Sequence, residues 1–178
     1  SQPNLSPDKR TLYFAARDPS GFGGSDLFVC YLQPNGQWGT PRNMGPEINT
    51  SGDESCPFIH ADNQSLYFTS NGLQGYGGDD LFMARKGPKG SFSLPRNLGY
   101  PINTIENEGS LVITADGSTA YYASDRADSK GGLDLYTFTM RNDVRPVKTL
   151  WIKGRVMDEK TKDGLPSAVE LTDILTRQ

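Results

Sequence analysis

The chain has 178 residues, and its 18 basic and 21 acidic residues give it a formal charge of −3. The basic residues are scattered rather than clustered, so the sequence lacks the basic patch that is typical of a nucleic-acid-binding protein. No stretch reaches the roughly 18 consecutive apolar residues of a transmembrane helix, so we expect no membrane span. With 20 Gly, 12 Pro and little helical periodicity, the composition favours an all-β fold of short strands and many turns.

A glycine pair followed by Asp, Leu and an aromatic residue recurs every 54 residues, at positions 23–28, 77–82 and 131–136. We expect each glycine pair to supply the positive φ of a tight turn, and each Leu-Phe or Leu-Tyr pair to begin a strand. Between the first two copies the match continues without a gap through Pro-Arg-Asn and Ile-Asn-Thr stretches. A fixed repeat of this size is typical of propellers and solenoids.

Residues 1–53 form the first copy, which turn-forming residues divide into four predicted strands. These strands are expected at 2–5, 11–16, 26–32, and from Trp38 to the Ile48-Asn49-Thr50 stretch. Four-stranded repeats that cannot bury both faces alone stack radially as the blades of a β-propeller. Because the first residues already lie inside a repeat, we expect the chain to be a fragment of a longer protein.

The second and third copies cover residues 54–107 and 108–146. Four strands are predicted in the second copy, and three in the third copy, whose outer strand is degenerate. Their predicted positions are 56–60, 65–70, 80–85, 91–98, 110–114, 119–124 and 134–140. Since closed propellers use about four to eight blades, three blades predict an open arc with exposed apolar faces at both ends.

The periodic pattern stops near Pro146. Residues 151–156 alternate like a strand, 158–164 predict a polar turn, and 168–171 predict the start of another strand. Two strands cannot form an independent core. We therefore divide the chain into propeller blades at 1–146 and the start of a second, truncated domain at 147–178.

Three acids, Asp26, Asp80 and Asp134, keep the same place in the repeat. Such acids could ligate calcium or act as a general base, but an acid that serves every blade is typical of a structural role. We predict that their oxygens accept hydrogen bonds from turn N–H groups. In the second copy Asp79 adds a second acid next to Asp80, which leaves a calcium site as an alternative. The spaced acids of a dedicated calcium loop are missing. No cofactor is indicated.

His60 is the only histidine, so a Ser-His-Asp site would have to use it, and no G-x-S-x-G motif accompanies it. We predict a turn or surface role for His60, no catalytic residues, and no enzymatic activity. Cys30 and Cys56 are the only cysteines, and we predict buried free thiols, with a disulfide as the alternative.

The loop after the second strand of each copy contains a repeat position that varies, occupied by Arg17, Asn71 and Asp125. This variation predicts a loop that is free to contact a partner. Aromatic pairs lie within the preceding strands, and alternation predicts that one member of each pair packs against a neighbouring blade. The pairs are Tyr13-Phe14, Tyr67-Phe68 and Tyr121-Tyr122.

The motif P-D-G-x-x-L-Y-F-x-S-x-R, then G-G-x-D-[IL]-[YF], then W-x-x-P-x-N-L-G-x-x-I-N-T resembles the TolB-type, WD-like β-propeller repeat. Residues 38–45 and 124–126 carry it well, and the resemblance covers 2–146. The I-N-T ending resembles the variant found in OmpA-family envelope proteins of Bacteroidetes, which include a type IX secretion component. The tail, 152–158 and 164–171, is similar to the start of a carboxypeptidase-regulatory-like, transthyretin-type β-sandwich.

This resemblance implies a periplasmic, outer-membrane-associated scaffold that binds envelope or secretion-system proteins and has no catalytic activity. In such proteins peptidoglycan is bound by a downstream OmpA-like domain, which we expect to lie outside these 178 residues. Two other classes remain open. A glycosidase-type or peptidase-type propeller would need a pair of acids at the channel mouth, and a carbohydrate-binding module would need aromatic residues exposed on one rim.

Overall fold

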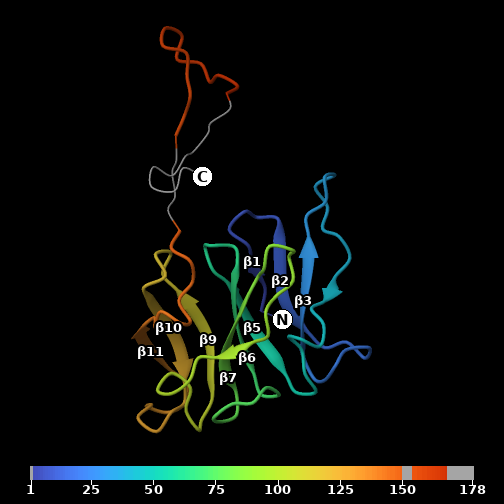
Figure 1. Ribbon diagram of the computed structural model, residues 1–178, viewed down its shortest axis with the longest axis vertical. Coiled ribbons are helices and arrows are strands. Elements are labelled where there is room, and N and C mark those ends of the chain that lie inside the picture. Colours follow the sequence, from blue (N-terminus) through green and yellow to red (C-terminus); the bar gives the residue numbers. More distant parts are fainter. Residues whose placement is uncertain (1, 150–153, 168–178) are drawn as a thin grey trace.

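The computed structural model describes residues 2–149 and 154–167. Its strands form three separate antiparallel sheets, one for each sequence repeat. Figure 1 shows the three sheets side by side, from the first at the right to the third at the left. Each sheet follows the order of the chain, with its first strand at one edge and its last at the other. The prediction of an all-β partial propeller is confirmed.

The strand bounds follow the repeat closely. The first sheet contains β1 (Asn4–Leu5), β2 (Thr11–Ala16), β3 (Asp26–Tyr31) and β4 (Arg42–Asn43). The second contains β5 (Glu54–Ile59), β6 (Ser65–Ser70), β7 (Asp80–Arg85) and β8 (Arg96–Asn97). The third contains β9 (Glu108–Ile113), β10 (Thr119–Ser124) and β11 (Asp134–Thr139). The degenerate third copy therefore has three strands among the described residues, as predicted.

The outer strands β4 and β8 are shorter than predicted, because the chain turns inward after two residues. At Gly45, φ is +87°, a conformation that favours glycine, and its carbonyl accepts a hydrogen bond from the Asn49 N–H at 2.9 Å. This turn places the Ile48 side chain in the core between the first two sheets. The prediction that the Ile48-Asn49-Thr50 stretch ends a strand is therefore wrong.

The inner strands β5 and β9 each contain a bulge, seen as a register shift against the neighbouring strand. Cys56 and Ser110 adopt positive φ values of 49° and 52° within these bulges. The Cys56 N–H donates to the Gln2 side-chain oxygen at 2.9 Å, and its Sγ lies 3.7 Å from the Ser110 hydroxyl. Gln2, Cys56 and Ser110 share one repeat position, so the bulges bring three equivalent residues together at the inner edge of the arc.

Two apolar clusters hold the three sheets together, one at each interface between neighbouring blades. On β6, Tyr67 belongs to the cluster shared with the third sheet, whereas Phe68 belongs to the cluster shared with the first sheet. Alternation along the strand thus buries both faces of the middle blade. This confirms that the aromatic pair of the second repeat packs against the neighbouring blades.

The described strands form an open arc, as predicted. Strands of the second sheet contact both neighbours, and no described strand of the first sheet contacts a described strand of the third. The outward face of the third sheet is exposed: Leu135 is 83% exposed and Tyr121 49%. In the second sheet the equivalent residues, Leu81 and Tyr67, are buried.

The glycine pairs have a different role from the one predicted. At Gly23 and Gly77 φ is not positive, and a side chain at either position would overlap the backbone of the loop that leads into the next blade. Among the glycines of the three pairs, only Gly131 and Gly132 have positive φ, of 94° and 124°, and a Cβ at either of them would meet nothing within 4 Å. In the first two copies, glycine is therefore required for close packing between blades.

After the third sheet, the structure describes residues 154–167 as a polar turn closed by a bridge between Met157 and Gly164. The Asp158 carboxylate accepts hydrogen bonds from the backbone N–H groups of Lys160 and Thr161, both at 2.8 Å. This is the predicted turn at 158–164. The predicted strand at 151–156 lies partly, and the one at 168–171 wholly, outside the described residues, so the second domain stays a prediction.

None of the described segments is a helix long and apolar enough to cross a membrane.

Candidate functional site

The repeated acids of the first two blades lie buried at the start of β3 and β7. Asp80 accepts hydrogen bonds from the backbone N–H of Tyr76 at 2.5 Å and of Gly77 at 3.3 Å. The Asn97 side-chain amide donates a third at 2.9 Å. Asp26 accepts the corresponding bonds from the Phe22 N–H and the Asn43 amide, at 2.8 and 2.6 Å. These are the contacts that a structural role requires.

The third blade lacks most of this network. Asp134 is only partly buried, and among residues 2–149 and 154–167 it accepts one hydrogen bond, from the Lys130 N–H at 2.5 Å. The residue one repeat after Asn97 is Trp151, which lies outside the described residues. The three acids therefore share a turn but not an equal set of partners.

Two further buried polar side chains in each of the first two copies, an Asn and a Glu, link the turn around the repeated acid to the next blade. We did not predict their roles. In the second copy, Asn103 bonds both backbone groups of Leu81 at 2.9 Å and donates to the Asn97 oxygen at 2.8 Å. Glu108 accepts bonds from the Thr104 N–H and hydroxyl and from the Ser124 hydroxyl. The gapless match of the I-N-T stretch and of the following Glu between the first two copies was the available signal.

We predict that Asp80→Leu lowers the free energy of unfolding by about 1–3 kcal/mol, because it leaves turn N–H groups without an acceptor. Asp80→Asn keeps one oxygen acceptor and should cost clearly less. Asp134→Leu is the matched control, since Asp134 has fewer partners, and its cost should be smaller still. Urea denaturation measures all three values. A large drop in melting temperature on adding a chelator to the unmodified protein would favour the calcium interpretation instead.

Asp79 is half-buried directly before β7, and its N–H donates to the side-chain oxygen of Asn107, in the loop that leads into the third blade, at 3.1 Å. Burial raises the pKa of Asp79 above its ordinary value, and the nearby carboxylates of Asp53, Asp80 and Asp125 raise it further. In the described part of the chain, no three His, Cys, Asp or Glu side chains are grouped as metal ligands. A calcium site at Asp79 and Asp80 would therefore need backbone carbonyls, and it stays untested.

The three loop positions predicted to face a partner lie on the rim where β2, β6 and β10 end. Arg17 is 82% exposed, and its guanidinium lies 3.9 Å from the Asp53 carboxylate. Asn71 and Asp125 each accept a hydrogen bond from the backbone N–H of the loop that enters their blade, Asp53 and Asn107 respectively, both at 2.7 Å. Two of the positions thus also support the loop between blades, while Arg17 extends into solvent.

His60 is fully buried between the second and third blades, so the predicted surface role is wrong. Its Nε2 lies 3.0 Å from the Thr114 carbonyl, and its Nδ1 lies 3.7 Å from the Asp62 carboxylate. Burial opposes the charged form, but the Asp62 carboxylate and the Thr114 carbonyl outweigh it and hold the pKa of His60 above its ordinary value. The turn that His60 begins packs against the third blade. The sequence around His60 does not show this contact, because Thr114 lies 54 residues away.

Both cysteines are free, which confirms that part of the prediction. Cys30 is buried, and burial raises the pKa of its thiol. Cys56 is only half-buried, in contrast to the prediction, because the β5 bulge turns it toward Gln2 and Ser110.

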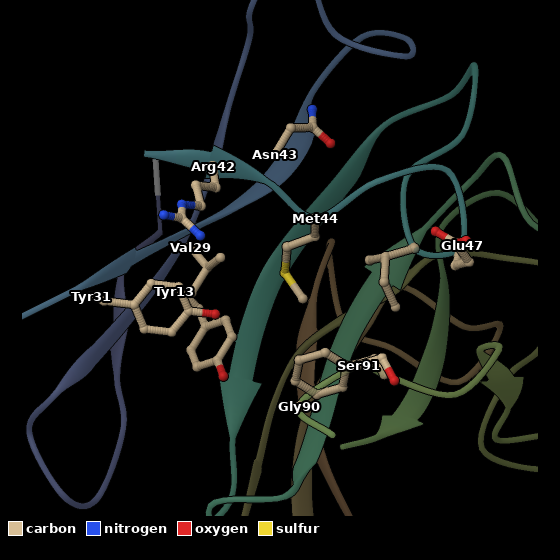
Figure 2. Close-up of a pocket in the computed structure, with 11 residues that line it drawn as sticks. Tyr13, Val29, Tyr31, Arg42, Asn43, Met44, Glu47, Gly90 and Ser91 are labelled. Carbon is tan, nitrogen blue, oxygen red and sulfur yellow. The ribbon is translucent and has the colours of Figure 1, made fainter. Parts of the chain in front are cut away.

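An open groove of about 510 Å³ lies between the first and second blades. Its volume falls within the range of roughly 300–1,000 Å³ that is usual for ligand sites. Figure 2 shows its lining, with the Tyr13, Val29 and Met44 side chains gathered toward its middle and Arg42 and Glu47 toward opposite ends. The guanidinium of Arg42 lies 6.0 Å from the centre of the Tyr31 ring. The sequence did not predict this groove, because its walls come from separate repeats.

Comparison with solved structures identifies the architecture. A putative TolB from Agrobacterium tumefaciens aligns with a TM-score of 0.55 and 14% identity over 80% of this chain and 46% of its own. TolB from Acinetobacter baumannii aligns with a TM-score of 0.51 and 16% identity over 75% of this chain and 28% of its own. The chain thus spans less than half the length of either protein. No protein-family model and no curated protein matches the sequence. At these identities the similarity concerns the fold, and the chain has the fold of a TolB-like, partial β-propeller.

Proposed function

We propose that this chain is part of a non-enzymatic scaffold in the bacterial envelope, in which the propeller binds other proteins. The observation that carries the proposal is the TolB-like fold, built from a repeat that resembles those of OmpA-family envelope proteins. The proposal that the scaffold is not an enzyme is supported by two of the repeated acids. Asp26 and Asp80 are buried and accept hydrogen bonds from N–H groups of their own turns.

The resemblance implies a periplasmic location in association with the outer membrane. Its most specific form is a PorE-like component of type IX secretion, with other secretion-system or envelope proteins as partners. In this proposal peptidoglycan is bound by a downstream OmpA-like domain and not by the propeller. Arg17 is the loop residue best placed to contact a partner, because its side chain is 82% exposed and its one ion pair within the described residues is a long one with Asp53.

A binding experiment with two arms tests this proposal. In the first, the immobilised chain is exposed to a periplasmic extract from a Bacteroidetes bacterium, captured proteins are identified, and each is purified and tested for direct binding. We expect an envelope protein whose affinity falls with Arg17→Glu and not with Arg155→Glu, a matched change on the exposed turn at 154–167.

In the second arm the chain is sedimented with purified peptidoglycan. We expect it to stay in the supernatant, while a longer protein that includes an OmpA-like domain should sediment. Sedimentation of the chain alone with cell wall would contradict the scaffold proposal. A hydrolase activity that disappears on changing one acid would contradict it as well.

A further inference from the structure

In the part of the chain that the structure describes, the repeat forms two equivalent grooves, one at each interface between blades, and a segment of the chain fills one of them. The groove between the second and third blades contains the segment 143–145, which follows β11. The groove between the first and second blades is the open one of about 510 Å³. The filled groove therefore shows what kind of chain the open groove can receive.

In the filled groove, three side chains of the second blade bind the segment. The Tyr67 hydroxyl donates to the Val144 carbonyl at 2.6 Å, and the Arg85 guanidinium donates to the Arg145 carbonyl at 2.8 Å. The Arg96 guanidinium pairs with the Asp143 carboxylate at 2.9 Å. The Val144 side chain is fully buried in the apolar cluster between these blades. The groove thus binds an acid, a peptide carbonyl and an aliphatic side chain in succession.

The open groove keeps most of these binding groups. Tyr13 and Arg42 stand one repeat before Tyr67 and Arg96 and line it. In the part of the chain that the structure describes, neither the Tyr13 hydroxyl nor the Arg42 guanidinium has a hydrogen-bond or ion-pair partner. The apolar wall is also kept, since equivalent positions line both grooves: Val29, Met44 and Ile48 in one, Met83, Leu98 and Ile102 in the other.

The difference lies in the segment that would fill the groove. Gly90 stands one repeat before Val144, so this position of the segment has no side chain to take the place of Val144. The nearest apolar side chain of the segment is Phe92, whose ring packs edge-on against that of Tyr13 with 6.3 Å between the ring centres. Lys89 stands one repeat before Asp143, so the segment has a cation in place of the acid that pairs with Arg96 in the filled groove. The segment beside the open groove therefore lacks the aliphatic side chain and the carboxylate that Val144 and Asp143 supply in the filled groove, and an external ligand can provide both.

We propose that this groove binds an extended peptide segment of another protein, in which an acidic residue precedes an aliphatic one. The Arg42 guanidinium pairs with the acid, the Tyr13 hydroxyl donates to a peptide carbonyl, and the aliphatic side chain packs on Met44 and Ile48. Glu47, at the far end of the groove from Arg42 (Figure 2), suits a basic residue further along the peptide. This inference rests on the proposed function as a protein-binding module and names the chemistry of one partner.

The probe is a fluorescent, end-capped peptide with the sequence of residues 141–146, Arg-Asn-Asp-Val-Arg-Pro. Its binding to the whole chain is measured by anisotropy, and methyl chemical shifts of Met44 and Ile48 report the site. We expect Arg42→Glu to weaken binding about fivefold or more, because an attractive pair becomes a repulsive one. A peptide with Lys in place of the Asp should then recover most of that loss. Tyr13→Phe should cost about twofold to tenfold.

Arg155→Glu, an equal charge change on the exposed turn at 154–167, should leave peptide binding unchanged. Arg42 is exposed, so its variant should keep the melting temperature of the unmodified chain. Absence of peptide binding, or binding that Arg42→Glu does not alter, would overturn the inference. Self-association abolished by Arg42→Glu, without peptide binding, would assign the groove to a second copy and overturn it too. Capture of an envelope protein in the absence of peptide binding would overturn the groove assignment alone and leave the proposed function standing.

Discussion

Leu81→Ala is expected to lower the free energy of unfolding by about 2–5 kcal/mol, whereas Leu135→Ala should change it by less than about 0.5 kcal/mol. The two leucines hold the same repeat position and follow the same acid. Leu81 is 1% exposed, within the cluster between the second and third blades, so its truncation leaves a cavity. Leu135 is 83% exposed on the outward face of the third blade, where little packing is lost.

Urea denaturation of both variants beside the unmodified chain measures the difference. The two leucines are matched in residue type, strand position and neighbouring sequence, so each serves as the control for the other. Equal costs would mean that the outward face of the third blade is covered in solution, for example by a second copy. Sedimentation at several protein concentrations would then reveal the association.

Glu108→Leu is expected to cost about 3 kcal/mol or more, because three donors lose a charged acceptor. Glu108 is buried where the third blade begins, and its carboxylate accepts bonds from the Thr104 N–H at 2.8 Å and hydroxyl at 2.7 Å. A third bond comes from the Ser124 hydroxyl at 2.8 Å. The carboxylate thus ties the loop between blades to the middle strand of the third sheet.

Glu108→Gln retains one oxygen and most of the shape, so it should cost less than Glu108→Leu and should fold even if the leucine variant does not. Glu159→Leu, on the exposed turn at 154–167, is the matched control and should be close to neutral. Chemical denaturation gives the three values. A cost for Glu108→Leu as small as that for Glu159→Leu would show that the carboxylate is not needed to join the blades.

The repeat predicted the architecture well because the strands of a blade depend on local pattern. Alternating apolar and aromatic residues define β2, β6 and β10, and turn residues bound them on both sides, so their predicted and observed ranges agree. The outer strands were predicted less well. Asn49 and Asn103 interact with residues 22 positions earlier, and such distant contacts leave little trace in local propensity.

The candidate site was predicted only in part. The acids at 26 and 80 bind turn N–H groups, as expected of structural acids, because turn and acid are neighbours in sequence. The open groove was not predicted, because Arg42 and Gly90 belong to different blades and line one groove only when the blades stack. His60 was misplaced for the same reason, since Thr114, its partner, lies 54 residues away.

The sequence by itself determined that this protein is a tandem array of antiparallel blades, since each copy carries its own strands, turns and acid within 54 residues. Only the tertiary structure decided which equivalent residues of the copies are buried and which are exposed. Leu81 and Leu135 share a local sequence, yet one is buried and the other exposed, because a further blade covers only the first. The glycine pairs at 77–78 and 131–132 differ in φ in the same way, since a neighbouring loop packs only on the earlier pair. Burial and close packing depend on the neighbouring blade, and a repeat cannot specify its neighbour by its own sequence.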